Sequence, residues 1–296
     1  MKRAARKLGI AFGLGGVGLL GATWWLGGRL TAPAHGPVGP PPEDLPLEEV
    51  ELTNERGERT RGWWHRGRGA GTVVLLHPLR TDRRAMLKRA QLLAEAGFGS
   101  LLVDLRAHGE SHGHRITFGL TESADARAAV RFARERRAGG PVAAIGFSLG
   151  GAAALLGPAP LEVDALVLEA VYPSIADAIE ARLAMRAGRF GARVLAPLLL
   201  SQIRPRLGIR ARELRPIDAL GKVRSPVLVA AGTADPKTPL EQSRRFFAAA
   251  PEPKELWEVE GAGHQDFLEH APETYRERVL GFLARYLGSG VPARPS

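Results

Sequence analysis

The feature that most limits how this chain can fold is a serine set between glycines, in the stretch Gly146-Phe147-Ser148-Leu149-Gly150-Gly151. An apolar run over 141–145 precedes it and a small, helix-prone run over 151–156 follows it. The serine thus stands where a buried strand passes into a helix, and the glycines leave room for a strained turn that exposes its hydroxyl. The new helix directs backbone N–H groups at an oxyanion. The pattern predicts a nucleophilic Ser148; a glycine-rich turn without chemistry is the alternative.

A serine nucleophile needs a histidine base, which should follow it in the chain. His264 and His270 are the histidines downstream of Ser148. His264 lies in a glycine-rich loop after an alternating strand pattern, whereas His270 falls inside the expected C-terminal helix, where a solvated surface residue is the simpler interpretation. We therefore predict His264 as the general base.

The base needs an acid to orient it, and Asp235 is the preferred candidate. The run 227–232 reads as a buried parallel strand that leads directly into Asp235. In open α/β sheets the functional site lies at the carboxyl ends of the strands, so an acidic residue directly after such a strand is well placed for catalysis. A helix-capping role in an Asp-Pro turn is the alternative for Asp235, and Glu169, at the end of an earlier strand, is the rival acid.

An oxyanion hole requires two donors. The backbone N–H of Leu149, directly after the nucleophile, is the first expected donor. The second should come from the loop after the strand over 72–77, and Leu79 is the candidate because Pro78 has no N–H. His77 and Arg80, on either side of this pair, are candidate substrate-binding residues.

These stretches, together with Val103-Asp104-Leu105-Arg106-Ala107-His108-Gly109, resemble the α/β-hydrolase superfamily, in particular the bacterial branch of serine aminopeptidase-like (Hydrolase_4) and Bem46-like esterases. The resemblance spans residues 45–288. It implies an α/β-hydrolase fold: a mostly parallel sheet with helices on both faces, an antiparallel edge hairpin at its start and an inserted helical lid. Pro78 replaces the glycine of the family's usual His-Gly motif, and Ala107 replaces the glycine of its Arg-Gly-His-Gly motif.

The patterning agrees with one large domain, since the chain has 296 residues and 45% hydrophobic content. Segments 47–52 and 60–64 flank a turn and predict the antiparallel hairpin. Helices are expected over 82–96, 121–137, 151–156, 239–249 and 267–286. The catalytic domain should cover 45–288 with a lid insertion over 175–222, followed by a disordered tail over 289–296.

The N-terminus indicates a membrane anchor. Residues 1–7 are basic, and the stretch from Leu8 to Gly28 carries no charge. About twenty helical residues suffice to cross a bilayer, with the basic flank in the cytoplasm. We therefore expect residues 1–30 to form a single-pass transmembrane signal anchor, with the catalytic domain outside the cytoplasm at the cell membrane. Cleavage near Ala34, which would release a secreted or periplasmic protein, is the alternative. The proline-rich segment 31–44 should be a semi-rigid linker.

The formal net charge of +10 does not indicate nucleic-acid binding. Half of the excess lies in the first thirty residues, and most of the rest lies between Ile175 and Arg215, within the expected lid. An apolar stripe over 194–200, flanked by arginines, could cover an acyl-binding cleft or rest on anionic lipid; a solvated helix is the alternative. The body of the domain is close to neutral, so no nucleic-acid partner is expected.

No cofactor or metal is expected. His108, His112 and His114 share a loop with Glu110, but the family loop already accounts for His108. Without cysteine there are no disulfides and no thiolate chemistry.

The predicted activity is therefore that of a serine hydrolase that cleaves a carboxylic ester or thioester through an acyl-enzyme. A peptidase or acyltransferase on the same triad is the alternative within the family. A non-catalytic, membrane-tethered binding protein is the alternative of another class.

Overall fold

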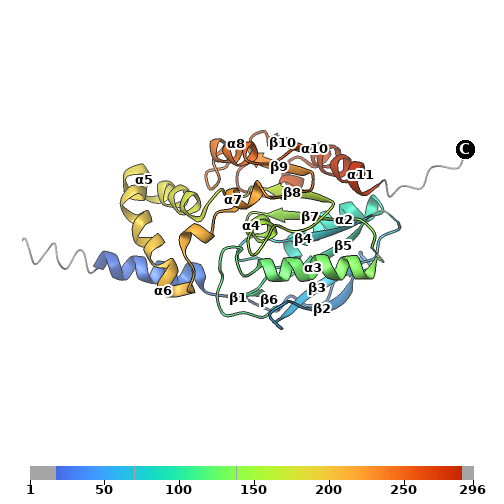
Figure 1. Ribbon diagram of the computed structural model, residues 1–296, viewed down its shortest axis with the longest axis horizontal. Coiled ribbons are helices and arrows are strands. Elements are labelled where there is room, and N and C mark those ends of the chain that lie inside the picture. Colours follow the sequence, from blue (N-terminus) through green and yellow to red (C-terminus); the bar gives the residue numbers. More distant parts are fainter. Residues whose placement is uncertain (1–17, 70, 138, 289–296) are drawn as a thin grey trace, which may run out of the picture.

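The computed structural model describes residues 18–69, 71–137 and 139–288, and its centre is an eight-stranded sheet (Figure 1). The strands, in spatial order, are β10 (Lys254–Val259), β9 (Val227–Gly232), β8 (Ala165–Glu169), β7 (Val142–Phe147), β4 (Thr72–Leu76), β5 (Gly99–Val103), β3 (Arg59–His65) and β2 (Glu48–Thr53). Every neighbouring pair from β10 to β5 is parallel. The β2–β3 hairpin is antiparallel and adds to β5 in the antiparallel sense, so the predicted edge hairpin is confirmed.

The strand sequences explain this layering. The central strands β4, β5 and β7 are buried along their whole length, as expected for continuous apolar runs covered on both faces. The edge strand β2 instead alternates, and only Val50 and Leu52 point into the core. Successive residues of β4 serve opposite faces: Val73 packs into one core cluster and Val74 into the other. The sheet therefore separates two hydrophobic cores.

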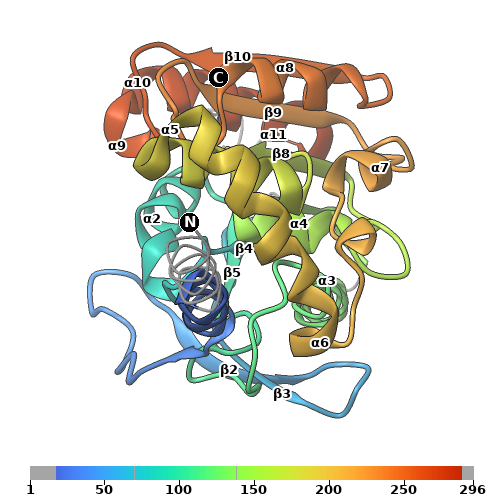
Figure 2. The same ribbon diagram turned by 90° about the vertical axis from the view of Figure 1, so that its left-hand side faces the viewer.

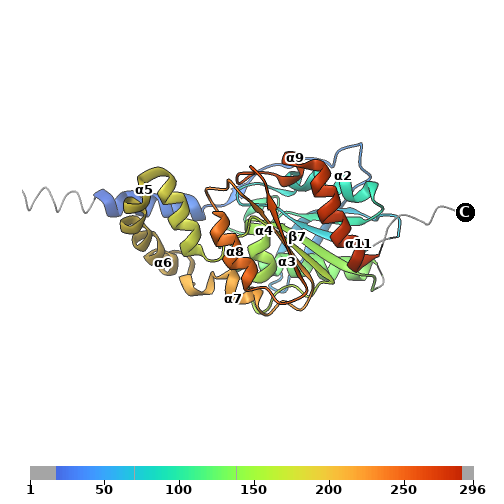
Figure 3. The same ribbon diagram turned by 90° about the horizontal axis from the view of Figure 1, so that it is seen from above.

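Helices cover each face of the sheet (Figure 3). One face carries α2 (Leu87–Glu95) and the C-terminal elements α9 (Phe267–His270), α10 (Pro272–Tyr275), the π-helical η3 (Arg276–Leu280) and α11 (Gly281–Leu287). The other face carries α3 (Ser123–Arg136), α4 (Leu149–Leu155), α7 (Pro216–Leu220) and α8 (Leu240–Ala248). The predicted helix over 267–286 is divided because Pro272 starts a new helix at α10.

A helical lid is inserted between β8 and β9, as the sequence predicted. It contains α5 (Ile175–Ser201), α6 (Ile203–Leu207), η2 (Ala211–Glu213) and α7. Helix α5 bends at Gly188, where φ is +68°, a conformation that glycine adopts without strain. Figure 1 shows α5 and α6 together at one end of the molecule, beyond the carboxyl ends of the parallel strands.

The predicted membrane anchor is wrong. Within residues 18–288, gaps at 70 and 138 aside, no helix is both long and apolar enough to cross a bilayer. The part of this segment that the structure describes is helical over residues 18–31 and contains several glycines, which lower its hydropathy. The predicted cell-membrane location and the signal-anchor assignment are wrong for the same reason. Residues 1–17 of the expected segment, and the predicted disordered tail over 289–296, lie outside the described residues.

The proline-rich segment 31–44 is also not a free spacer. Its strand β1 (Ala34–His35) pairs in parallel with β6 (His108–Gly109), and Val38 is buried in the core. The N–H of Val38 donates to Glu110 Oε1 at 3.1 Å. Prolines remove backbone donors, which suits an edge of this kind, and the composition alone concealed these contacts.

Candidate active site

Ser148 occupies a strained turn between β7 and α4. Its backbone has φ +51° and ψ −105°, which a non-glycine residue adopts only when the surroundings enforce it. A side chain at Gly146 would place Cβ 2.5 Å from the Gly151 nitrogen, and one at Gly150 would place it 2.1 Å from the Leu76 carbonyl oxygen. The two glycines are thus required by the close approach of α4 to β7 and β4. The Ser148 N–H donates to the Glu169 carbonyl at 2.8 Å, which fixes the turn to β8.

The structure brings the three predicted triad side chains into one hydrogen-bonded chain. His264 Nε2 lies 3.2 Å from Ser148 Oγ, and His264 Nδ1 lies 2.7 Å from Asp235 Oδ2. A carboxylate only accepts, so Nδ1 carries the proton and Nε2 is left to accept from the serine hydroxyl. This is the tautomer that a general base requires.

Asp235 is held by the turn that follows β9. Its Oδ1 accepts from the backbone N–H groups of Lys237 at 2.7 Å and Thr238 at 3.0 Å, which leaves Oδ2 for the histidine. The side chain is only 1% exposed. Asp235 therefore braces this turn with one oxygen and contacts His264 with the other, but it does not cap the following helix α8 (Leu240–Ala248), whose N-cap is Pro239 and has no side-chain capping bond.

The His264 loop follows β10, and the imidazole packs edge-on against Phe147 with ring centroids 5.4 Å apart. His270 lies elsewhere, at an exposed site where its ring nitrogens contact the Glu260 carbonyl and Gln265. The ring of His264, rather than that of His270, reaches Ser148.

Glu169, the rival acid, belongs to a buried ionic cluster instead. Arg89 Nη2 donates to Glu169 Oε2 at 2.5 Å and Arg89 Nη1 donates to Asp266 Oδ2 at 2.7 Å. The Tyr275 hydroxyl donates to Glu169 Oε1 at 2.6 Å, and burial raises the pKa of this tyrosine well above its ordinary value. Glu169 is thus engaged by Arg89 and Tyr275, and no local sequence pattern indicates this cluster.

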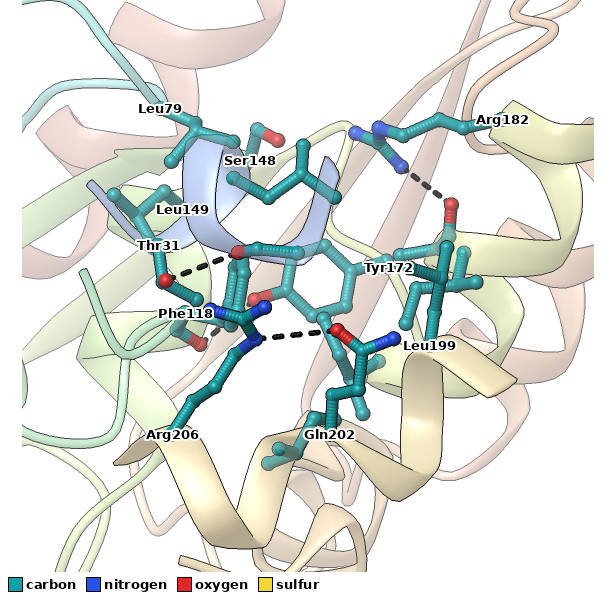
Figure 4. A pocket seen from close by; sticks show the side chains of 16 residues that line it. Thr31, Leu79, Phe118, Ser148, Leu149, Tyr172, Arg182, Leu199, Gln202 and Arg206 are labelled. Carbon is teal, nitrogen blue, oxygen red and sulfur yellow. Dashed lines mark hydrogen bonds between the residues drawn. The ribbon is translucent and has the colours of Figure 1, made fainter. Parts of the chain in front are cut away.

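The two expected oxyanion donors flank the nucleophile. Leu149 is the first residue of α4, and a first-turn N–H has no acceptor inside its own helix. Leu79 follows Pro78 in the loop after β4, and both leucines line the same pocket as Ser148. Figure 4 shows Leu79, Leu149 and Ser148 together at one end of that pocket.

The other two residues predicted to bind substrate have structural contacts. His77 is fully buried: its Nδ1 donates to the Pro78 carbonyl at 2.7 Å, and its Nε2 accepts from the Leu105 N–H at 2.9 Å. Burial lowers the pKa of His77 to about 4, so the ring is neutral and has no free nitrogen for a substrate. Arg80 Nη1 donates to the carbonyl of Arg29 at 3.0 Å, which connects the oxyanion loop to the N-terminal helix.

The histidine and glutamate side chains of the loop over 108–114 do not gather around one point. His108 Nδ1 lies 2.8 Å from the Arg106 carbonyl, and burial lowers the pKa of His108 to about 3. Glu110 is paired with Arg83 at 2.6 Å. In the part of the chain that the structure describes, no cluster of three or more histidine or acidic side chains could hold a metal ion.

A pocket opens beside Ser148 between the lid and the sheet (Figure 4). Its lining is predominantly apolar and includes Leu30, Leu79, Phe118, Leu149, Tyr172, Ile175, Ala178, Ile179, Leu199 and Ile203. The Tyr172 hydroxyl donates to the Phe118 carbonyl at 2.8 Å, so its ring, rather than its polar end, is available to a ligand. Sequence reasoning anticipated a cleft under the lid but missed these aromatic residues, which stand in loops without a distinguishing pattern.

A family model described as "Alpha/beta hydrolase family" matches residues 73–278. The protein Rv2307c of Mycobacterium tuberculosis (strain ATCC 25618 / H37Rv) is 32% identical over 262 residues, which cover 86% of this chain and 84% of the relative. YqkD of Bacillus subtilis (strain 168) is 26% identical over 72% of this chain and 70% of its own.

Among solved structures, the Pyrococcus furiosus esterase Pf2001 superposes with a TM-score of 0.72 at 24% identity, covering 88% of this chain and 99% of that one. The α/β hydrolase GrgF from Penicillium sp. sh18 gives a TM-score of 0.63 at 23% identity, covering 82% and 99%. These likenesses confirm the predicted fold, whereas the narrower serine aminopeptidase-like or Bem46-like branch stays a prediction. The sequence match and the fold together show that this chain belongs to the alpha/beta hydrolase family.

Proposed function

We propose that this protein is a serine esterase that cleaves carboxylic esters through an acyl-enzyme. The observation that supports it most is the hydrogen-bonded chain from Asp235 through His264 to Ser148, with distances of 2.7 and 3.2 Å. Such a chain makes a serine alcohol nucleophilic at neutral pH. The apolar pocket beside Ser148 supports an ester with a hydrophobic group.

In the acylation step, Ser148 Oγ attacks the ester carbonyl carbon while its proton passes to His264 Nε2. The carbonyl oxygen becomes an oxyanion, which the N–H groups of Leu149 and Leu79 stabilise. His264 then gives the proton to the leaving alcohol oxygen as the C–O bond breaks. Asp235 accepts from Nδ1 throughout and stabilises the imidazolium.

Deacylation repeats these events with water. His264 Nε2 takes a proton from water, the resulting hydroxide oxygen bonds to the acyl carbon, and the proton returns to Ser148 Oγ as the acid leaves. The domain arrangement that we propose for this chemistry is a catalytic domain over 45–288 with the lid over 175–222.

Esters are favoured over peptides for two reasons. An alcohol leaves without the strong protonation that an amine requires. The structural neighbour from Pyrococcus furiosus is itself named an esterase. Peptidase and acyltransferase activity on the same triad are distinguished by offering aminoacyl substrates and competing acyl acceptors and analysing the products.

The test is hydrolysis of p-nitrophenyl butyrate by the full-length protein and by Ser148→Ala and His264→Ala. We expect a burst of nitrophenol equal to the enzyme concentration, which reports the acyl-enzyme, and a fall in kcat of at least about 10⁴-fold in both variants. A folded wild-type protein without hydrolysis would favour the non-catalytic binding protein, and unchanged hydrolysis in Ser148→Ala would contradict the mechanism.

A further inference from the structure

The wall of the pocket beside Ser148 includes a segment that no part of the triad requires. The N-terminal helix (residues 18–31) contributes Gly27, Leu30 and Thr31 to the lining, although it lies more than a hundred residues before the nucleophile. Figure 1 and Figure 2 both show this helix beside α5 and α6 of the lid. The pocket is therefore lined by the N-terminal helix as well as by the lid and the loops around Ser148.

The C-terminal end of the N-terminal helix is fixed to the catalytic domain. Arg80, in the loop that carries the proposed oxyanion donor, donates to the carbonyls of Arg29 at 3.0 Å and Ala32 at 3.4 Å. The Ile116 N–H donates to the carbonyl of Thr31 at 3.0 Å. A cationic side chain on the last carbonyls of a helix stabilises that helix end.

The same helix also contacts the lid. The guanidinium of Arg206, in α6, lies over the ring of Trp24 at 3.9 Å from its centroid and donates to the Trp24 carbonyl. Gly27 comes so close to α6 that a Cβ would lie 2.5 Å from Gln202 Oε1 and 3.0 Å from Arg206 Nε. The absence of a side chain at Gly27 is what allows this approach.

The polar side chains at this end of the pocket make hydrogen bonds to protein atoms. Gln202 Nε2 donates to the Leu198 carbonyl at 3.1 Å, and Arg206 Nε donates to Gln202 Oε1 at 3.2 Å. The Thr31 hydroxyl donates to the Gly27 carbonyl at 3.0 Å. Most of the remaining lining is leucine, isoleucine and aromatic surface, which an apolar chain fits.

We propose that the substrate is an ester with an extended apolar chain, and that the N-terminal helix sets the length of chain the pocket accepts. This proposal rests on the proposed esterase function. Ser148 stands with Leu79 and Leu149 at one end of the pocket (Figure 4). Gly27 and Leu30 belong to the lining that the helix contributes, so a chain that grows from the ester fills the space between the lid and this helix.

The test compares full-length wild-type protein with Gly27→Leu and Leu30→Ala. Substrates are p-nitrophenyl esters from acetate through octanoate to laurate, and a second series of acetates of alcohols from ethanol to dodecanol. Gly27→Leu should lower kcat/KM for the long-chain members by at least about tenfold, and leave the shortest member within about twofold. Leu30→Ala should shift the preferred length upward. The series that responds identifies whether the chain belongs to the acid or the alcohol.

Gly21→Leu is the matched control, because a Cβ at Gly21 meets no atom within 4 Å and the residue is not part of the pocket lining. It should leave both length profiles unchanged. The proposal is overturned if wild-type protein hydrolyses esters and neither Gly27→Leu nor Leu30→Ala changes either profile. Absence of hydrolysis by wild-type protein for every ester is a different result, and it contradicts the esterase function itself.

Discussion

The loops that follow β7, β9 and β10 bring Ser148, Asp235 and His264 together, and the contacts around each residue hold its side chain in place. Ser148 keeps a positive φ because β7, β4 and β8 surround its turn, and Asp235 divides its two oxygens between the backbone and His264. The burial of Asp235 makes each of these hydrogen bonds costly to lose. Because each oxygen of Asp235 has its own partners, a substitution that changes only the atom facing His264 should lower activity with little effect on stability.

Replacing Asp235 by asparagine should lower kcat by about 10⁴-fold with little change in stability. Asparagine can still accept from the N–H groups of Lys237 and Thr238, but its amide no longer stabilises the imidazolium of His264. Steady-state kinetics with p-nitrophenyl butyrate measure the effect. Glu169→Gln is the comparison, and an equal loss of kcat in this variant at unchanged stability would return the role of acid to Glu169.

Replacing Gly150 by alanine should destabilise the protein by about 3 kcal/mol, since the new Cβ would lie 2.1 Å from the Leu76 carbonyl oxygen. Gly281→Ala is the control: it lies in α11, nothing stands within 4 Å of its Cβ, and alanine favours helix by up to about 1 kcal/mol. Urea denaturation gives both free energies of unfolding. Equal stability of the two variants would show that α4 can shift away from β4.

At the scale of elements, Arg89 links the pieces that carry the triad. It joins α2 to Glu169, whose carbonyl accepts from the Ser148 N–H, and to Asp266, which caps α9 two residues after His264. The side chains of Arg89 and Glu169 are 2% and 0% exposed, so the loss of Arg89 leaves Glu169 as a buried carboxylate without this cationic partner.

Arg89→Met should therefore lower the free energy of unfolding by about 3–5 kcal/mol. The control is Arg84→Met, which removes an ion pair to Asp82 whose arginine is 51% exposed, and it should cost less than about 1 kcal/mol. Urea denaturation of both variants measures the two losses in the free energy of unfolding. Similar losses would mean that water reaches the Arg89 cluster.

Much of the fold follows from local sequence patterns, but the contacts around the pocket do not. Apolar runs such as 72–76 and the glycines around Ser148 encode strands and the tight turn through sterics, which act within a few residues. The residues Ser148, Asp235 and His264 could be selected because each follows a strand. Long-range contacts, such as Arg80 with Arg29 or Arg206 with Trp24, join segments with no pattern that relates them. Because such contacts leave no local pattern, the composition of the N-terminal segment favoured an anchor and a spacer.

For the molecule as a whole, two buried histidines make stability depend on pH. Burial lowers the pKa of His77 to about 4 and that of His108 to about 3, whereas an unfolded histidine titrates near about 6.5. Between these values the unfolded chain binds more protons than the folded protein. The stability due to the neutral rings is complete above about pH 6.5 and is lost as the pH falls.

His108→Asn, which keeps a donor near the Arg106 carbonyl, should weaken this dependence by up to about 1.4 kcal/mol per pH unit between about pH 6 and pH 4. Urea denaturation of wild-type and variant protein over this range gives the difference, in which the titration of groups common to both proteins cancels. Parallel stability curves would show that His108 binds its proton equally in both states.

The central claim is that Ser148 is the nucleophile and that His264 activates it. Its most direct test is the reaction of the full-length protein with a fluorophosphonate, followed by mass mapping of the adduct. We expect one phosphonyl group on Ser148, none on Ser148→Ala, and strongly slowed labelling of His264→Ala. A folded wild-type protein that stays unlabelled, or an adduct that maps to another residue, would contradict the account.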